Sequence, residues 1–341
     1  MIKFIKSNEI SNVRYIPQFV NDISIIVEKD SKELLAYNKK FEIIWRVNKK
    51  LYSCLIVENI IVPDLLALYD LKGGLIYSIQ KPEDYNRENI FYESLTLWKT
   101  VDANDDVLFH VFDIQKKEFL KKNIPLNYQP VAFMNHNLLL AKMSATIVLY
   151  NISSNTPLWQ ADLSELAAYE DWQGKHQGEI ANVYVADDKV LVNAGPFVFC
   201  FALETGGLLW QLKSAEGKFY SMVIDHGVAY LTYWRHYAEI DINKGIFLIE
   251  KEIVDFEYRH KKIFFQAKGT PVYHKGLIWM TLYTGGIPFI AALLPEKGEI
   301  IWVQHIASSH SINAPKFHNN HMYILDTGGT LHIFEEENVN P

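Results

Sequence analysis

Residues Phe201–Trp210 read FALETGGLLW, and this stretch decides the fold. An apolar segment, Phe201–Leu203, leads into the turn Glu204–Gly207, and a second apolar segment then ends in a large aromatic residue, Trp210. Glycine adopts the positive φ angles that tight turns between strands require, so the pattern predicts two antiparallel strands joined at this turn. Because the pattern recurs along the chain, its repetition predicts the architecture.

The other copies have the same order: an apolar segment, a polar turn and an apolar segment that ends in an aromatic or aliphatic marker residue. The markers are Trp45, Tyr77, Leu120, Trp159, Trp210, Leu248 and Trp302. Successive markers are 32 to 54 residues apart, about 43 on average. Repeats of about 40–45 residues with four short strands each are typical of propeller blades. Pairs of apolar segments between markers, such as Val183–Val185 and Val190–Val192, supply the remaining strands.

The two ends of the chain predict how the ring closes. Three strand-like segments follow Trp302 (Ala314–Phe317, Met322–Leu325 and Leu331–Phe334), whereas Ile2–Ile5 is a single strand without a sheet. We therefore expect an all-β protein in which residues 1–341 form a single closed propeller of eight four-stranded blades, the N-terminal strand completing the last blade. The blades would end near residues 45, 77, 120, 159, 210, 248 and 302, with 311–335 and 2–6 forming the eighth. Seven blades is the alternative, because the copies around residues 50–77 and 84–120 are the poorest.

The repeat resembles that of a known family. The turn Ala202–Gly207 with Trp210, and Ala314–Pro315 followed by Tyr323–Leu331, resemble the repeat of the quinoprotein (PQQ-like) propellers. The resemblance covers nearly the whole chain and implies that Trp45, Trp159, Trp210 and Trp302 pack between adjacent blades as structural residues. That family includes cofactor-dependent dehydrogenases, outer-membrane assembly scaffolds and cofactor-free binding proteins, so the fold does not select the function.

Charge, hydrophobic runs and cysteine content argue against a nucleic-acid-binding, membrane-spanning or disulfide-bonded protein. The chain has 33 basic and 40 acidic residues, a net charge of −7, and no long basic stripe, which disfavours a nucleic-acid partner. No apolar run is long enough to span a membrane, and the N-terminus lacks a signal-peptide core. Cys54 and Cys200 lie 146 residues apart in apolar runs, which indicates two buried thiols and a reducing compartment. We expect a cytoplasmic protein that is monomeric alone; a chain whose signal peptide had been removed would read the same way.

The sequence contains no convincing catalytic, cofactor or metal motif. The triplet Asp326-Thr327-Gly328 occurs once, where the repeat expects a turn, whereas an aspartic-protease site needs a pair. Of the late histidines (His305, His310, His318, His321 and His332), His318 and His321 bracket a two-residue turn, so hydrogen-bonded or surface roles are favoured over zinc. The stacking Trp and calcium ligands of a quinone site are not recognisable. The sequence therefore predicts a protein that is not an enzyme and has no cofactor or metal.

Three segments are longer than a blade requires. Gln80–Glu93 is polar with Tyr85 in its middle, Gln160–Gly178 offers Ser164 as the N-cap of a short helix, and Glu250–Lys268 suggests an extra hairpin. All three fall between the last strand of one blade and the first strand of the next, and such links emerge on one face of a propeller. We expect a binding surface there.

The candidate partner-binding residues come from these links and from a second-to-third-strand turn on the same face. They are Tyr85, Tyr169, Glu170, Asp171, Trp172, Trp234, Arg235 and His236. Trp, Tyr and Arg are the side chains that most often anchor protein interfaces. The competing interpretation is that Trp172 and Trp234 plug the loops against the ring.

These observations favour a non-enzymatic protein-binding scaffold over other functions. One version is an immunity or inhibitor protein that blocks a toxin or an enzyme. The acidic balance suggests a partner with a basic patch. The alternative is an enzyme or a quinone- or sugar-binding protein that uses the central channel, which convergent carboxylates or a Trp facing a void would support.

Overall fold

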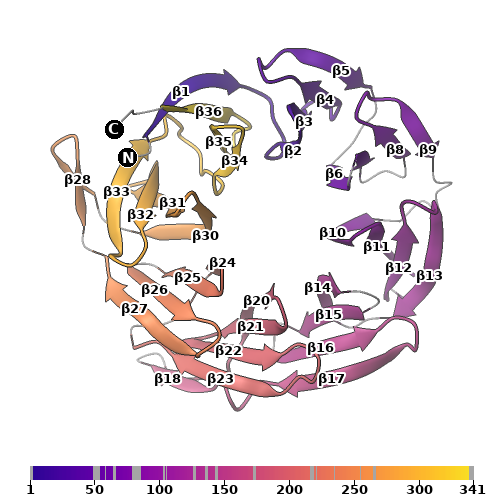
Figure 1. The fold of residues 1–341 in the computed structure, drawn as a ribbon, viewed down its shortest axis with the longest axis vertical. Helices are drawn as coiled ribbons and strands as arrows, with labels where there is room; N and C mark the ends of the chain where they lie inside the picture. Colours follow the sequence, from indigo (N-terminus) through magenta and orange to yellow (C-terminus); the bar gives the residue numbers. More distant parts are fainter. Residues whose placement is uncertain are drawn as a thin grey trace.

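The fold is a ring of eight blades. The computed structural model describes residues 3–48, 54–57, 59–63, 67–78, 86–102, 104, 106–125, 128–134, 137–142, 145–171, 174–215, 219, 221–233, 235–253, 255–263 and 266–337. The strands in these ranges form eight four-stranded sheets and two two-stranded hairpins. The sheets surround a central axis as blades, with their first strands innermost (Figure 1). The prediction of an all-β, eight-bladed propeller is confirmed, and the seven-bladed alternative is wrong.

Each blade is an antiparallel sheet in chain order. Blade 1 comprises β2 (Gln18–Val20), β3 (Ile23–Val27), β4 (Leu34–Tyr37) and β5 (Ile43–Val47), and blade 2 comprises β6 (Cys54–Val57), β7 (Ile60–Pro63), β8 (Ala67–Asp70) and β9 (Leu75–Ser78). Blade 3 comprises β10 (Asn86–Tyr92), β11 (Leu95–Val101), β12 (Val107–Asp113) and β13 (Glu118–Pro125), and blade 4 comprises β14 (Gln129–Met134), β15 (Asn137–Lys142), β16 (Thr146–Asn151) and β17 (Thr156–Asp162).

The second half of the ring follows the same plan. Blade 5 comprises β20 (Ile180–Ala186), β21 (Lys189–Ala194), β22 (Phe197–Ala202) and β23 (Leu208–Lys213), and blade 6 comprises β24 (Ser221–Asp225), β25 (Val228–Tyr233), β26 (His236–Asp241) and β27 (Ile246–Glu252). Blade 7 comprises β30 (Ala267–His274), β31 (Leu277–Thr284), β32 (Ile287–Leu294) and β33 (Glu299–His305), and blade 8 comprises β34 (Lys316–His318), β35 (His321–Leu325), β36 (Leu331–Glu337) and β1 (Lys3–Ile10).

Blade 8 closes the ring by joining the two ends of the chain. β1 pairs antiparallel with β36, from Lys3 opposite Glu337 to Ile10 opposite Leu331. Figure 1 shows the indigo β1 beside the yellow β36, with both termini at the outer side of the ring. The expected completion of the last blade by the N-terminal strand is confirmed. Pairing β1 with β36 leaves β36 inside the sheet instead of at an exposed edge.

The chain order of the strands defines two faces of the ring. Links between blades and turns between second and third strands lie on one face, which we call the link face. The inner turns (between first and second strands) and the outer turns (between third and fourth strands) lie on the opposite face, the turn face. The antiparallel order of every four-stranded sheet dictates this division.

The hydrophobic core is divided among the interfaces between blades. Each of the eight clusters of buried side chains contains residues from two neighbouring blades. In β21, Val190 and Val192 face blade 4 whereas Leu191 faces blade 6, because side chains alternate along a strand. Both faces of a middle strand are therefore buried, which explains the continuous apolar runs in the sequence.

Tryptophans in the fourth strands of blades 1, 4 and 5 attach these blades to the next. The indole Nε1 groups of Trp45, Trp159 and Trp210 donate to Leu71 O at 2.8 Å, Leu203 O at 2.7 Å and Ile242 O at 2.9 Å. Each acceptor lies in the outer turn of the following blade, and we call this contact a dock. Trp302 instead packs against Trp279 and Phe4, at ring-centroid distances of 5.4 and 6.3 Å, at the junction with blade 8. These four tryptophans pack between blades, as the sequence resemblance implied.

In two blades the marker position lies one residue later than the sequence alignment placed it. The residues opposite the third strand at the position of Trp210 are Lys121 in blade 3 and Ile249 in blade 6, one residue beyond Leu120 and Leu248. Leu120 and Leu248 occupy the β-bulge that precedes the marker position, as Leu209 does in blade 5. The alignment chose these leucines because no tryptophan follows them to identify the marker position. Lys121 Nζ donates to Ile152 O and so makes the dock to blade 4.

Candidate functional site

The link face is extended over blades 5 to 7 by two additional hairpins. β18 (Tyr169–Asp171) pairs with β19 (Gly174–His176) in the link before blade 5, and β28 (Phe256–Tyr258) pairs with β29 (Lys261–Ile263) in the link before blade 7. Figure 1 shows β28 and β18 at the outer margin of the ring in this view. The extra hairpin expected within Glu250–Lys268 is confirmed.

The short helix expected after Ser164 is wrong. Residues 164–167 form a turn instead of a helix. Asp162, and not Ser164, stabilises the start of this turn, because its carboxylate accepts a 2.8 Å hydrogen bond from Ser164 N. This bond and the Ser164 hydroxyl lower the pKa of Asp162. Ala167 N then bonds to Leu163 O at 2.8 Å, and both of these side chains are fully buried. Once they are packed the chain has no second apolar turn to bury, so it continues as a hairpin.

The first hairpin is held against the ring by Tyr169. Gly195, in the second-to-third-strand turn of blade 5, has φ +57°, and a Cβ there would lie 2.7 Å from Tyr169 Cε1. The opposite side of Tyr169 stacks on His176 at 4.7 Å, and His176 Nε2 is 2.7 Å from Asp171 Oδ1. Tyr169 and Asp171 therefore stabilise the hairpin itself. Glu170, which is exposed, points to the other side.

Arg235 fixes the link that leads to the second hairpin. Its Nε lies 3.0 Å from Glu252 Oε1 and its Nη2 lies 3.1 Å from Asp255 Oδ1, while its carbonyl accepts a 2.7 Å bond from Ile253 N. The adjacent His236 is half-buried at the start of β26. The guanidinium thus has acidic partners within its own chain, which its sequence context did not reveal.

The second hairpin is anchored by aromatic packing and offers a charged tip. Phe256, Tyr258 and Ile263 pack on the core between blades 6 and 7, and the Tyr258 ring lies 5.4 Å from that of Phe289. Arg259 and His260 form the turn with φ angles of 51° and 63°, the conformation favoured by tight hairpins. The His260 side chain is 99% exposed.

The predicted partner-binding residues fall into three groups. Tyr169, Glu170 and Asp171 share the first hairpin; Arg235 and His236 lie on the link face of the adjacent blade 6. The structure gives no direct contact between these two groups among the described residues. Tyr85, Trp172 and Trp234 lie outside the described residues.

The motifs that the sequence assigned to turns are turns in the structure. Asp326 accepts bonds from Thr330 N at 2.8 Å and Ser308 Oγ at 2.7 Å and lies beside His332. Burial alone would raise the pKa of this carboxyl, but these hydrogen bonds outweigh burial and lower it. Asn319 and Asn320 have φ angles of 46° and 59° in the inner turn of blade 8. In the described part of the chain, no group of three or more His, Cys, Asp or Glu side chains could hold a metal ion.

The innermost strands of the blades can be checked for the groups that a central site would use. Within the eight innermost strands, β2, β6, β10, β14, β20, β24, β30 and β34, there is no Trp, and Glu88 and Asp225 are the acidic residues. Cys54, in β6, is half-buried, and no disulfide joins it to Cys200. Burial raises the pKa of the Cys200 thiol to about 12, so this thiol is unreactive at neutral pH.

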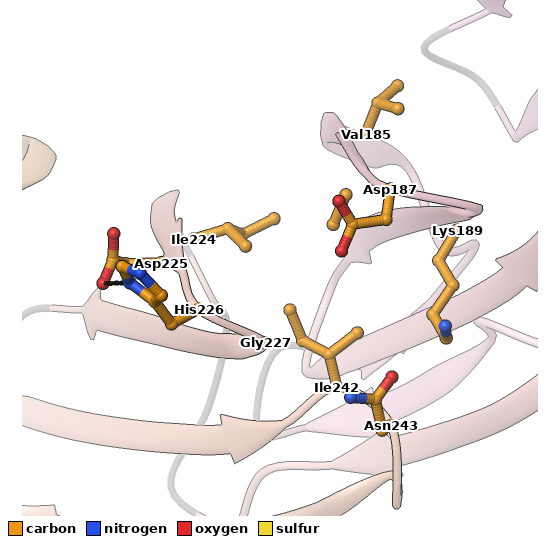
Figure 2. A pocket seen from close by; sticks show the side chains of 10 residues that line it. Val185, Asp187, Lys189, Ile224, Asp225, His226, Gly227, Ile242 and Asn243 are labelled. Atoms are coloured by element: carbon orange, nitrogen blue, oxygen red, sulfur yellow. Dashed lines mark hydrogen bonds and ion pairs between the residues drawn. The ribbon is translucent and has the colours of Figure 1, made fainter.

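Sequence reasoning missed a cavity on the turn face. It has a volume of about 490 Å³ and lies between the inner turn of blade 5 and the inner and outer turns of blade 6. Asp187 and Lys189 come from one side, and Asp225, His226 and Asn243 from the other (Figure 2). The available signal was a polar inner turn in each of two consecutive blades, but the proximity of these turns depends on the packing of the two blades.

Comparison with known proteins supports the fold and does not identify a family. No protein-family model and no curated protein sequence matches the chain. The chain is similar to the computationally designed Ika8 protein, with 13% identity, 95% of this chain and 96% of the other covered, and a TM-score of 0.65. It is also similar to Saccharomyces cerevisiae Sqt1 (10% identity, 98% of each chain, TM-score 0.62) and to BamB from Moraxella catarrhalis (13% identity, 98% and 100%, TM-score 0.48).

The described ranges contain no helix that is long and apolar enough to cross a bilayer.

Proposed function

We propose that this propeller is a non-enzymatic scaffold that binds another protein through the link face over blades 5 to 7. The observation that carries the proposal is the pair of anchored hairpins. Each buries an aromatic anchor against the ring, Tyr169 on Gly195 and Tyr258 on Phe289, and presents charged side chains outward. Rigid loops with exposed polar groups on a stable scaffold are the usual construction of a recognition surface.

The proposed partner has a basic patch. The chain has a net charge of −7, and complementary charge accelerates encounter and selects against acidic competitors. An immunity or inhibitor protein that occludes a toxin or an enzyme is one version of this function. We place the protein in the cytoplasm as a monomer.

We also assign the repeat to the quinoprotein-like type. Trp45, Trp159 and Trp210 make the inter-blade docks that this resemblance implies. A function without cofactor is favoured because the innermost strands, over their whole residue ranges, lack a Trp that could stack on a quinone ring.

Site-specific photocrosslinking tests the proposal. Glu170 and His260, one on each hairpin, are replaced singly by p-benzoylphenylalanine, and the protein is irradiated in its native lysate. Lys72, exposed in the outer turn of blade 2 on the turn face, receives the same replacement as a control.

We expect one protein to crosslink at both hairpin positions and not at Lys72, with a yield that falls as salt is added. Crosslinking at Lys72 alone, or no crosslinking at either hairpin, would contradict the proposed surface.

A further inference from the structure

The second hairpin carries the densest group of basic residues in the chain. Residues 259–262 read Arg-His-Lys-Lys, and Glu257 is the one acidic residue between Phe256 and Ile263. The link that contains the first hairpin has the opposite charge, since residues 162–179 include five acidic residues and a single lysine. A partner that covers both hairpins therefore meets surfaces of opposite sign.

The acidic residues that precede this hairpin have partners elsewhere. Arg235 holds two of them, since its Nε lies 3.0 Å from Glu252 Oε1 and its Nη2 lies 3.1 Å from Asp255 Oδ1. A third, Glu250, accepts a 2.7 Å hydrogen bond from Ser214 Oγ. These carboxylates are therefore engaged at the base of the hairpin, and the positive charge of its tip stays available to a partner.

Arg259 is held at the tip by an aromatic ring instead of a carboxylate. Its Cζ lies 5.4 Å from the centroid of the Tyr258 ring, and Tyr258 is itself packed on the core between blades 6 and 7. The Arg259 side chain is exposed and makes no hydrogen bond or ion pair with the described residues. Contact with a ring restricts a guanidinium while leaving its N–H groups free to donate. Arg259 is therefore positioned, charged and without an acceptor.

We propose that Arg259 binds a carboxylate in an acidic segment of the protein partner. A guanidinium presents paired N–H donors that match the two oxygens of a carboxylate, and Tyr and Arg are among the usual anchors of interfaces. The net charge of −7 argues against a nucleic acid as the source of the anion. This inference rests on the proposed protein interface and adds that the partner is acidic opposite the second hairpin. Its basic patch then faces the first hairpin, so opposite charges fix its orientation.

Calorimetric titration of the full chain with an acidic peptide tests this chemistry. The probe is a hexaglutamate peptide with acetyl and amide ends, and the hexaglutamine peptide is the neutral control. We expect the hexaglutamate peptide to bind saturably at low ionic strength and its affinity to fall as salt is added, because the contact is exposed. Single-stranded oligothymidylate, which offers phosphates in place of carboxylates, is titrated in parallel and should bind more weakly.

Substitutions at Arg259 and at a matched lysine locate the contact. Arg259→Gln should weaken binding of the hexaglutamate peptide about fivefold, the upper range for one exposed ion pair. Arg259→Lys keeps the charge without the paired donors and should restore only part of the affinity. Lys117→Gln is the control, since Lys117 also has a positive φ (60° against 51°) and also lies over a ring, 5.7 Å from the centroid of Tyr77. Lys117 is in the outer turn of blade 3, on the turn face, so its loss should leave binding unchanged.

The inference is overturned if the hexaglutamate peptide does not bind saturably, or if oligothymidylate binds more tightly than the peptide. It is also overturned if Lys117→Gln weakens binding as much as Arg259→Gln, because the effect would then be one of net charge. If a protein still crosslinks at His260 in any of these cases, the proposed interface stands and only its acidic chemistry fails. Unchanged melting temperatures of the variants verify that their folds are intact.

Discussion

The docks between blades 5 and 6 and between blades 3 and 4 use the same geometry with different chemistry. At the first, the Trp210 indole donates to Ile242 O at 2.9 Å and its ring lies on Gly245, where a Cβ would come within 2.4 Å of Trp210 Cγ. At the second, Lys121 Nζ donates to Ile152 O. Both acceptors are the first residue after the third strand, and both are aliphatic.

The difference extends to the residue on which the docking side chain lies. The outer turns that receive Trp45, Trp159 and Trp210 have Gly73, Gly206 and Gly245 at a position of positive φ. The turn that receives Lys121 has Asn155, with φ 61°, at the corresponding place. Positive φ alone does not demand glycine here, because asparagine adopts it. In these three turns, glycine occurs where an indole ring occupies the space of its missing side chain.

The largest expected effect is the loss of a tryptophan dock. Trp210→Ala removes a large ring from the interface between blades 5 and 6 and should lower the free energy of unfolding by about 3–4 kcal/mol. Lys121→Ala removes one charged hydrogen bond at a partly exposed site and should cost about 1 kcal/mol. Urea unfolding followed by far-ultraviolet circular dichroism measures both. Equal losses would show that the hydrogen bond, not ring packing, dominates a dock.

The second prediction separates ring contact from backbone strain. Gly276 has φ +76°, and a Cβ added at this residue would meet no atom within 4 Å, so Gly276→Ala tests strain alone. It should cost about 1 kcal/mol. Gly245→Ala, at φ +64°, adds the clash with Trp210 and should cost about 2 kcal/mol more. The same unfolding measurement applies; equal costs would mean that the indole moves aside freely.

The third prediction concerns pH and a buried histidine of blade 3. His110 is 1% exposed; Thr100 Oγ1 lies 2.8 Å from its Nε2, and Asn123 N donates to its Nδ1 at 3.1 Å. Burial, aided by the charge of Lys122, lowers the pKa of His110 to about 4. Protonation would also break the bond from Asn123, because Nδ1 would cease to be an acceptor.

This depressed pKa makes the fold sensitive to acid. Between pH 6.5 and 4 the unfolded chain binds a proton at His110 and the folded chain does not, so stability falls as pH decreases and is complete above pH 6.5. The expected loss at pH 5 is about 2 kcal/mol relative to pH 8. His110→Gln should reduce the dependence of the urea midpoint on pH. The pKa of His274 is also lowered by burial, so some slope should remain. An unchanged slope would contradict the assignment to His110.

The comparison of docks explains how far the sequence could predict the fold. A turn with glycine followed by tryptophan is recognisable where the dock is aromatic, as at Trp159 and Trp210. Lys121 has no such signature, so the repeat in blade 3 was weak and its marker was placed one residue early. The count of eight blades was nevertheless predictable, because the strands left over at both ends had to complete one sheet.

The site was less predictable than the fold. The link-face hairpins could be located from the extra length of their segments, but not the inward orientation of Tyr169 or the acidic partners of Arg235, which come from other parts of the chain. The cavity depends on the inner turns of blades 5 and 6 lying side by side across an interface between the two blades. Sequence separation conceals such proximity, since each turn by itself resembles an ordinary solvent-exposed turn.

The pairing of β1 with β36 has a consequence for biosynthesis. A ribosome delivers β1 first and β36 last, so the outer strand of blade 8 must wait for nearly the whole chain before it finds its partner. Until then the face of blade 1 that packs against blade 8 has no partner, and the ring is an open arc. We therefore expect folding of this propeller to finish late, with the pairing of β1 and β36.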